Sequence, residues 1–429
     1  MLEAGERKTH RKTLLNASTH DPYAALRYPE FRNLITGTFC LTMAILIQEV
    51  VLGYEIYRIT HDPLSLGLIG LAEAVPFISL ALFGGHLADR REKRTLMQMS
   101  LLTIILSSMV LVWATLPATR EQLGQSTMLL IIYGVIAALG FARGIYSPAG
   151  ASLKAFLVPR EHYGNSSTWS STFWQAGAIL GPGCAGFLYA GLGLTWTLLL
   201  VIALLLINLG LLSTIERRPV IAQPEAHENL WQSLREGLDY VFNNRIILYS
   251  ISLDMFSVLF GGVVAILPIF ADDILAVGAQ GLGILRAAPA VGAMLTIIAC
   301  AYFPPLKQAW RNLLLAVLGF GIATLVFAVS KIFWLSVAAL FFTGAFDSIS
   351  VVIRGTILQV IPPDHLRGRV QSVNSIFLSS SNELGAFESG LAAKLMGVVP
   401  SVIFGGTVTL AIVAGVWRKS RELFAVRLS

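Results

Sequence analysis

Long apolar runs separated by short polar segments dominate the hydrophobic pattern of this chain. A transmembrane helix needs roughly 20 mostly apolar residues. Runs of about this length occupy 34–57, 66–88, 95–116, 128–149, 166–189, 192–214, 246–270, 278–302, 312–330, 333–357, 370–394 and 398–417. The pattern therefore predicts an all-α membrane protein with twelve transmembrane helices.

The composition favours the same class. Hydrophobic residues make up 55% of the 429 residues and charged residues only 13%, whereas soluble domains carry about 25% charged residues. Residues 1–33 contain no apolar core ahead of the first run, so we expect no cleaved signal peptide. Cys40, Cys184 and Cys300 show no CxxC spacing, so we expect no metal site, disulfide or cofactor.

Lys and Arg are distributed unevenly between the loops. Most of those outside the runs lie in the N-terminal segment, the even-numbered loops and the C-terminal tail. Cytoplasmic loops carry such an excess, so both termini are predicted to be cytoplasmic. This asymmetry, together with contact to anionic lipids, explains the pI of about 9.3. We therefore expect membrane lipids as partners and no nucleic acid.

A polar stretch at 215–245 divides the chain into two halves of six runs. Within it, Leu230, Leu234 and Leu238 share one helical face opposite charged residues, which is typical of a helix lying on a membrane surface. The predicted organisation is a cytoplasmic N-terminal segment, a first bundle, this linker, a second bundle and a cytoplasmic tail, at 1–33, 34–214, 215–245, 246–417 and 418–429.

The two halves show a weak internal repeat. At one constant offset Gly140, Gly181 and Gly186 recur as Gly344, Gly385 and Gly390. A second offset places Pro76 on Pro289 and Glu73 on Arg286. Parallel repeats of six helices are a known transporter plan, with the substrate site between the halves. The repeat predicts two pseudo-symmetric six-helix bundles.

Charged residues inside the runs are candidates for function. The acids are Glu49, Glu55, Glu73, Asp254, Asp347, Glu383 and Glu388, and the bases are Arg143, Arg286 and Arg354. Each charge facing lipid at the membrane centre would cost about 2.5–3.5 kcal/mol, so most must pair, face a wet cavity or be neutral. Since acids outnumber bases, some carboxyl groups are expected to hold a proton. They either couple transport to protons or serve as fixed hydrogen-bond donors.

Glu383 and Glu388 belong to one run but are expected to have different roles. Five residues correspond to about 140° around a helix, so the two side chains lie on different faces. Glu383 is the better candidate for a proton-binding or cavity group, and Glu388 is expected to face a neighbouring helix. With Glu49 and Asp347, Glu383 completes the set of proton-coupling candidates.

The segment GGHLADRREKR at 84–94 resembles the loop signature of the major facilitator superfamily through Gly85, Leu87, Ala88, Asp89, Arg90, Lys93 and Arg94. Glu92 departs from it, standing where the family has a glycine of a tight turn. The resemblance implies two six-helix bundles and a cytoplasmic latch formed by Gly85, Asp89, Arg90 and Arg94. A carboxylate is favoured at the N-terminus of a helix, which gives such a latch a physical basis.

The same resemblance implies which helices surround the substrate. Helices 1, 4, 7 and 10 line the central cavity in this family, which yields as cavity candidates Gln48, Glu49, Arg143, Asp254, Asp347 and Arg354. The repeat sets Arg143 against Asp347, predicting an ion pair between them. Its second offset sets Glu73 against Arg286, a candidate pair for an outer gate.

Further segments narrow the resemblance to one branch. Gly177, Gly181, Pro182 and Gly186 resemble the antiporter motif of the fifth helix, although Ala185 departs from it, and ordinary helix packing explains such small residues equally well. The segments at 54–76 and 354–390 resemble the bacterial efflux branch that contains the enterobactin exporter. This implies an inner-membrane protein.

The resemblance favours one function and leaves a second open. It implies a monomer that exports a small organic molecule, such as a siderophore or amphipathic drug, by alternating access in exchange for protons. A lipid, lysolipid or nutrient carrier of the same fold is the alternative. A membrane-embedded enzyme is disfavoured, because no metal-ligand or nucleophile spacing appears, so we expect no enzyme activity.

Overall fold

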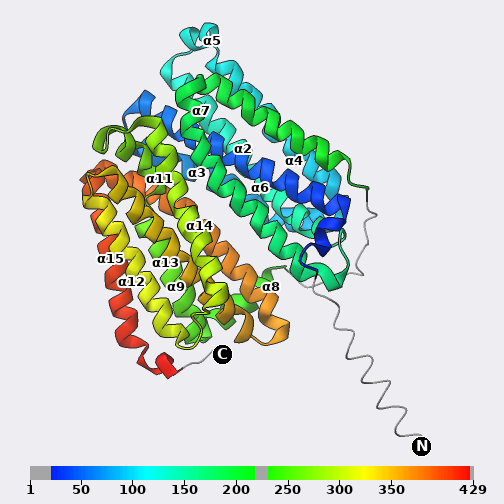
Figure 1. The fold of residues 1–429 in the computed structure, drawn as a ribbon, viewed down its shortest axis with the longest axis vertical. Helices are drawn as coiled ribbons and strands as arrows, with labels where there is room; N and C mark the ends of the chain where they lie inside the picture. Colours follow the sequence, from blue (N-terminus) through cyan, green and yellow to red (C-terminus); the bar gives the residue numbers. More distant parts are fainter. Residues whose placement is uncertain (1–20, 218–229, 426–429) are drawn as a thin grey trace, which may run out of the picture.

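The computed structural model describes residues 21–217 and 230–425, and all regular elements in this part are helical. Two bundles lie side by side (Figure 1). The main helices of the first are α2 (Pro29–Thr60), α3 (Pro63–Arg90), α4 (Lys93–Thr115), α6 (Gln125–Lys154) and α7 (Tyr163–Ser213). Those of the second are α9 (Arg245–Gly261), α11 (Gly278–Tyr302), α12 (Ala309–Val329), α13 (Phe333–Val360), α14 (Asp364–Met396) and α15 (Val398–Lys419).

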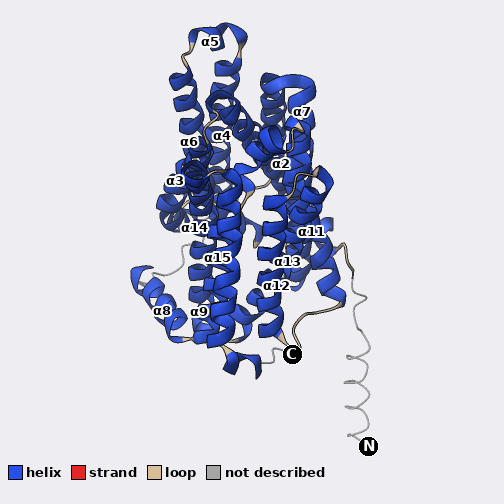
Figure 2. Ribbon diagram, turned by 90° about the vertical axis from the view of Figure 1, so that its left-hand side faces the viewer, coloured by secondary structure: helices blue, strands red, loops and turns tan. Residues whose placement is uncertain are grey.

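Short helices connect or flank the long ones. They are η1 (Ala24–Arg27), α5 (Pro117–Gln122), η2 (Arg160–His162), α8 (Leu230–Asn243), η3 (Val264–Ile266), α10 (Leu267–Ile269), η4 (Phe270–Ile274) and η5 (Arg421–Ala425). Figure 2 shows the same all-helical arrangement from the side, with α8 and the end of α15 at the same end of the second bundle.

Ten helical stretches within the described residues are long and apolar enough to cross a membrane. One of them contains α7, which holds two of the predicted runs joined at Gly193, where φ is +79° and the backbone turns. Glycine adopts this conformation without the steric penalty of a side chain. The polar helix α14 is not among the ten but coincides with the run predicted at 370–394. With α7 counted twice, twelve passes result, as the sequence predicted.

The seventh run is interrupted, which the apolar pattern did not predict. The sequence predicted one run over 246–270, but α9 ends at Gly261 and is followed by η3, α10 and the π-helical η4. Pro268 lies in the first turn of α10, where its missing N–H costs no hydrogen bond. The interruption places Asp272 and Asp273 at the end of this segment, facing the other bundle.

Close glycine contacts recur at matching places in both bundles. A Cβ added to Gly140 of α6 would stand 2.4 Å from the backbone oxygen of Glu73 on α3. A Cβ added to Gly344 of α13 would stand 1.9 Å from the backbone oxygen of Pro289 on α11. These are two of the glycines that the sequence repeat aligned, so the same tight helix pair is built twice.

The bundles meet along two helix pairs, α3 with α14 and α7 with α11. A Cβ on Gly186 would stand 1.9 Å from the backbone oxygen of Ala279, and one on Gly390 would stand 2.6 Å from Cα of Gly67. Gly177 and Gly181 instead pack against α2, and Pro182 lies inside α7. The small residues of the antiporter-like segment therefore serve close helix packing on both sides of α7.

The linker helix α8 lies against the second bundle. Gly237 packs on the backbone of Arg369 in α14, and Glu236 forms an ion pair with the Arg369 guanidinium. The exposed pair Arg235 and Asp239 lies on another face. Residues 1–20, 218–229 and 426–429 lie outside the described part of the chain, so the predicted segments at both termini and the first part of the linker are described only in part.

Candidate functional site

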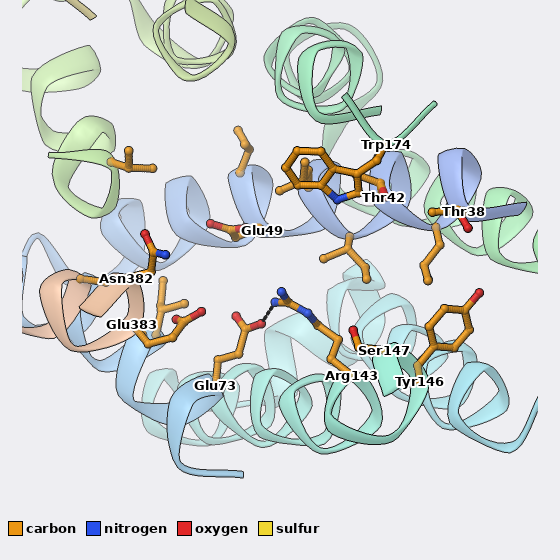
Figure 3. Close-up of a pocket in the computed structure, with 18 of the residues that line it drawn as sticks. Thr38, Thr42, Glu49, Glu73, Arg143, Tyr146, Ser147, Trp174, Asn382 and Glu383 are labelled. Carbon is orange, nitrogen blue, oxygen red and sulfur yellow. Dashed lines mark hydrogen bonds and ion pairs between the residues drawn. The ribbon is translucent and has the colours of Figure 1, made fainter. Parts of the chain in front are cut away.

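A cavity of about 760 Å³ lies between the bundles. Helices α2, α3, α6 and α7 supply one wall, while α10, α11 and α14 contribute residues from the second bundle. Its polar lining consists of Thr38, Thr42, Glu49, Glu73, Arg143, Tyr146, Ser147, Lys154, Ser170, Trp174, Arg286, Asn382 and Glu383. Figure 3 labels most of these side chains, among them Glu49, Arg143 and Glu383. The volume is typical of sites for small organic molecules.

Regular spacing on α2 builds one face of this cavity. Thr38, Thr42 and Glu49 are four and seven residues apart, so they share a face of the helix. The tight approach at Gly140 holds α6 against α3, which brings Arg143 and Ser147 towards the same space. The polar stripe on α2 could have been read from the sequence, because the two threonines fall at helical spacing from Glu49.

Glu73 of α3 and Arg143 of α6 form an ion pair inside the cavity (Figure 3). The Arg143 guanidinium also lies over the Phe77 ring, with 5.9 Å between its carbon and the ring centroid. The sequence paired Glu73 with Arg286 and Arg143 with Asp347, and both of these pairings are wrong. Positions equivalent by the repeat occupy corresponding places in different bundles, whereas α3 and α6 pack directly against each other.

Arg286 of α11 reaches across the interface to Glu49 of α2. The distance between Arg286 Nη2 and Glu49 Oε1 is 2.8 Å, and the two side chains are 13% and 33% exposed. The pair thus connects the bundles beside the cavity. A contact of this kind must break whenever the bundles separate at this level.

Glu383 of α14 also lines the cavity, next to Asn382 (Figure 3). Among the side chains that the structure describes, it has no ion-pair partner within 4.0 Å. The cavity is therefore lined by three carboxyl groups, at Glu49, Glu73 and Glu383, and by three cations, Arg143, Arg286 and Lys154. Glu388 of the same helix is not part of the lining.

Four of the predicted cavity residues do not reach this cavity. Gln48 is buried and accepts a hydrogen bond from the Ser108 hydroxyl of α4, at 2.8 Å. The other three lie inside the second bundle, where Asp254 pairs with Arg354 and Asp347 lies nearby. The family resemblance selected the helices but not their faces, and the face that a residue occupies decides whether it reaches the cavity.

Within the loop signature at 84–94, the structure describes the side chains only from Arg91 onward. The backbone of Gly85, Asp89 and Arg90 belongs to α3, but their side chains lie outside what the structure describes, so the latch stays a prediction. Glu92 is the N-cap of α4 and accepts hydrogen bonds from the backbone N–H of Arg94 at 3.0 Å and of Thr95 at 2.7 Å. This cap stands where the family has a glycine.

The capping bonds also set the charge state of Glu92. Partial burial acts to raise the pKa of this carboxyl group, but hydrogen bonds from Thr95 and Arg94 outweigh it and leave the pKa below its ordinary value. The carboxylate is also favoured by the positive end of the helix dipole. Glu92 is therefore ionised around neutral pH and stabilises the start of α4.

Cross-bundle contacts at the end remote from α8 were missed by the sequence analysis. The Tyr54 hydroxyl donates to Asp272 Oδ1 at 2.8 Å, and the Tyr57 hydroxyl donates to Asp273. Lys394 Nζ lies 2.9 Å from Asp62 Oδ2. The spacing of Tyr54 and Tyr57 on one face was a usable signal, but their partners follow the helix break, which the sequence did not reveal.

Comparison with known proteins decides the family. The sequence model of the family described as the Major Facilitator Superfamily matches residues 34–386 of this chain. The chain belongs to the major facilitator superfamily. Membership in this superfamily makes the chain a multi-pass membrane transporter rather than an enzyme.

Within the superfamily, exporters are among its curated relatives. The chain is 26% identical over 407 residues to the enterobactin exporter EntS of Salmonella typhi, covering 92% of this chain and 94% of that protein. It is 25% identical over 384 residues to EntS of Shigella flexneri, covering 88% of each chain.

Solved superfamily structures share the fold. The D-xylose-proton symporter superposes with a TM-score of 0.71 at 16% identity, covering 94% of this chain and 99% of that one. A mutant of the nucleoside transporter NupG gives 0.73 at 13% identity, covering 91% and 98%. At these identities the likeness concerns the fold alone.

Proposed function

We propose that this superfamily member exports a small organic molecule in exchange for protons. The observation that carries the proposal is the position of Glu383, which lines the space between the bundles and has no ion-pair partner among the described side chains. Glu383 is partly buried, and a carboxyl group that loses water contacts without gaining an ion-pair partner favours the protonated state. Opening the site to water on one side would then release the proton.

The substrate class follows from the lining and from the relatives. Trp174 and Tyr146 offer aromatic surface, while Arg143, Arg286 and Lys154 offer positive charge beside the carboxyl groups. Such a lining suits an amphipathic molecule that carries acidic or hydroxyl oxygen atoms. The relatives named enterobactin exporters favour a siderophore and the outward direction.

The orientation is part of the same proposal. The excess of Lys and Arg in the even-numbered loops and at the termini favours a cytoplasmic location for the end that carries α8, in a bacterial inner membrane. The contacts of Tyr54, Tyr57 and Lys394 then lie on the outer side and hold that side closed. In this arrangement the cavity would receive its substrate from the cytoplasm.

Transport by the purified chain in proteoliposomes with an imposed pH gradient tests this function. Siderophores, amphipathic drugs and lysolipids serve as probes in parallel. We expect movement of a siderophore or drug against its gradient, driven by protons moving the opposite way. Glu383→Gln should abolish the response to the gradient.

Glu388→Gln is the matched control, because Glu388 lies on the same helix outside the cavity lining. It should leave transport unchanged. Transport that ignores the pH gradient would contradict proton coupling. Movement of lysolipids alone would favour the lipid-carrier alternative, and movement of substrate and protons in the same direction would contradict export.

A further inference from the structure

A second group of buried charges lies inside the second bundle, apart from the cavity. Asp254 of α9 forms an ion pair with Arg354 of α13, and their side chains are 7% and 4% exposed. Asp347 precedes Arg354 by two helical turns on the same face of α13. Its charged neighbours in the described residues are Asp254 and Arg354. With both carboxyl groups ionised, the group would carry one negative charge in excess.

The described neighbours on α12 and α11 do not balance this charge. From α12 the neighbours are Val317 and Phe320. From α11 the contact with α13 runs through the backbone, since a Cβ on Gly292 would stand 2.0 Å from the oxygen of Phe341. The charged residue of α11, Arg286, pairs with Glu49 in the large cavity.

A small cavity of about 10 Å³ adjoins these carboxyl groups. It is lined by Asp254, Ser257, Val258, Val317, Phe320, Phe346, Asp347 and Ser350. Ser350, which lines this space, is only 4% exposed. The space matches about one water molecule. It shares no lining residue with the large cavity.

We propose that Asp254, Asp347 and Arg354 form a second proton-binding site, which holds one exchangeable proton shared by the two carboxyl groups. A buried charge without a partner is costly, and one proton makes the group neutral. The proton is taken from water onto a carboxylate oxygen and returned to water on release. The small cavity, which the buried Ser350 also lines, provides a place for the water molecule that carries it.

The position of this site suggests how it acts on the transport cycle. Asp254 belongs to α9, the helix that is interrupted after Gly261. The segment beyond the interruption carries Asp272 and Asp273, which hold the contacts to Tyr54 and Tyr57. A change of charge on α9 would therefore affect the segment that follows it, which closes one end of the transporter through Asp272 and Asp273. This coupling rests on the proposed function, whereas proton binding itself does not.

Infrared difference spectra of the full-length protein in liposomes, recorded between acidic and alkaline pH, test the proposal. The signal is the C=O stretch of protonated carboxyl groups. Asp347→Asn should remove one component of this band. Asp254→Asn should remove the same component although Asp347 remains, because Arg354 then balances the single carboxylate. The double variant should lose no more than either single variant.

Controls separate this result from misfolding and from other ligands. Asp347→Glu keeps the carboxyl group and should keep the component, while Glu422→Gln changes an exposed carboxyl group and should leave it unchanged. A band unaffected by both Asn variants, or losses that add in the double variant, would overturn the shared proton. Loss of the component on adding Na⁺ at constant pH would assign the site to a metal cation instead.

The spectra also distinguish the two proposals from each other. The first distinguishing result is an infrared component that changes in the Asn variants as expected while transport ignores the pH gradient. That result would contradict proton-coupled export but support the second proton-binding site. Transport that depends on the gradient, with no component lost in the Asn variants, would contradict the second site alone.

Discussion

Arg286 of α11 and Glu49 of α2 join the two bundles through an ion pair of 2.8 Å beside the central cavity. Both residues lie within transmembrane runs, so the pair stabilises one relative position of the bundles. Any state in which the bundles part at this level has to replace the contact with water or substrate.

Breaking this pair is expected to destabilise the state in which the two bundles are in contact at the end remote from α8, which we call the closed state of that end. Glu49→Gln and Arg286→Gln should each cost about 1.5–3 kcal/mol of the free energy of closure, the usual contribution of a hydrogen bond to a charged group. The rate of bismaleimide cross-linking between Asp62→Cys and Lys394→Cys reports closure, in a chain whose native cysteines are replaced by alanine. The native side chains at these positions are in contact at 2.9 Å.

The exchange Glu49→Arg with Arg286→Glu should recover part of the cross-linking rate. Arg235→Gln, which breaks an exposed pair on α8, is the control and should have no effect. Equal rates in the wild-type background and in both single variants would show that the pair does not contribute to closure.

The tyrosine hydroxyls at the same end give a second prediction. Tyr54→Phe removes the donor to Asp272 and leaves that carboxylate without this bond. We expect the equilibrium constant for closure to fall by about tenfold or more. Tyr133→Phe is a matched control, because its hydroxyl donates to the backbone of Ser65 within the first bundle. A similar loss of cross-linking in both variants would argue against a specific role for Tyr54.

Gly186 is predicted to tolerate no side chain. Its added Cβ would stand 1.9 Å from the backbone oxygen of Ala279, so Gly186→Ala should push α7 and α11 apart and destabilise the protein by about 1–3 kcal/mol. Gly191 of the same helix has no atom within 4 Å of such a Cβ. Gly191→Ala should therefore leave the Tm unchanged or raise it slightly. An unchanged Tm of the Gly186 variant in detergent would contradict this packing argument.

The cap at Glu92 predicts a pH-dependent stability. Glu92→Ala should cost about 1 kcal/mol at neutral pH, since it leaves two N–H groups of α4 without their acceptor. The pKa of Glu92 is lowered in the folded protein, so its contribution is present above the ordinary glutamate pKa of about 4.3 and is lost as pH falls through the lowered value. The Tm difference between the wild type and this variant should shrink accordingly in acid. A difference independent of pH would show that the ionised carboxylate is not the stabilising form.

The sequence by itself determined the class of protein and the number of passes. Apolar length is a local property, so the predicted runs coincide with the long helices even where α7 merges two of them, except at 246–270, where α9 ends at Gly261. The glycines aligned by the repeat, such as Gly140 and Gly344, occupy matching close contacts. The same local signals located Glu49, Glu73 and Glu383 inside the membrane without stating which partners they would have.

Tertiary structure decided the partners. The direction in which Arg286 or Gln48 points depends on the rotation of each helix and on which helix packs beside it, and neither follows from the order of residues along one helix. Glu73 therefore meets Arg143 through the packing of α3 on α6, while Asp347 lies in a separate group with Asp254 and Arg354. The interruption after Gly261 also became visible only in the structure, because the apolar pattern alone does not mark where the backbone stops being helical.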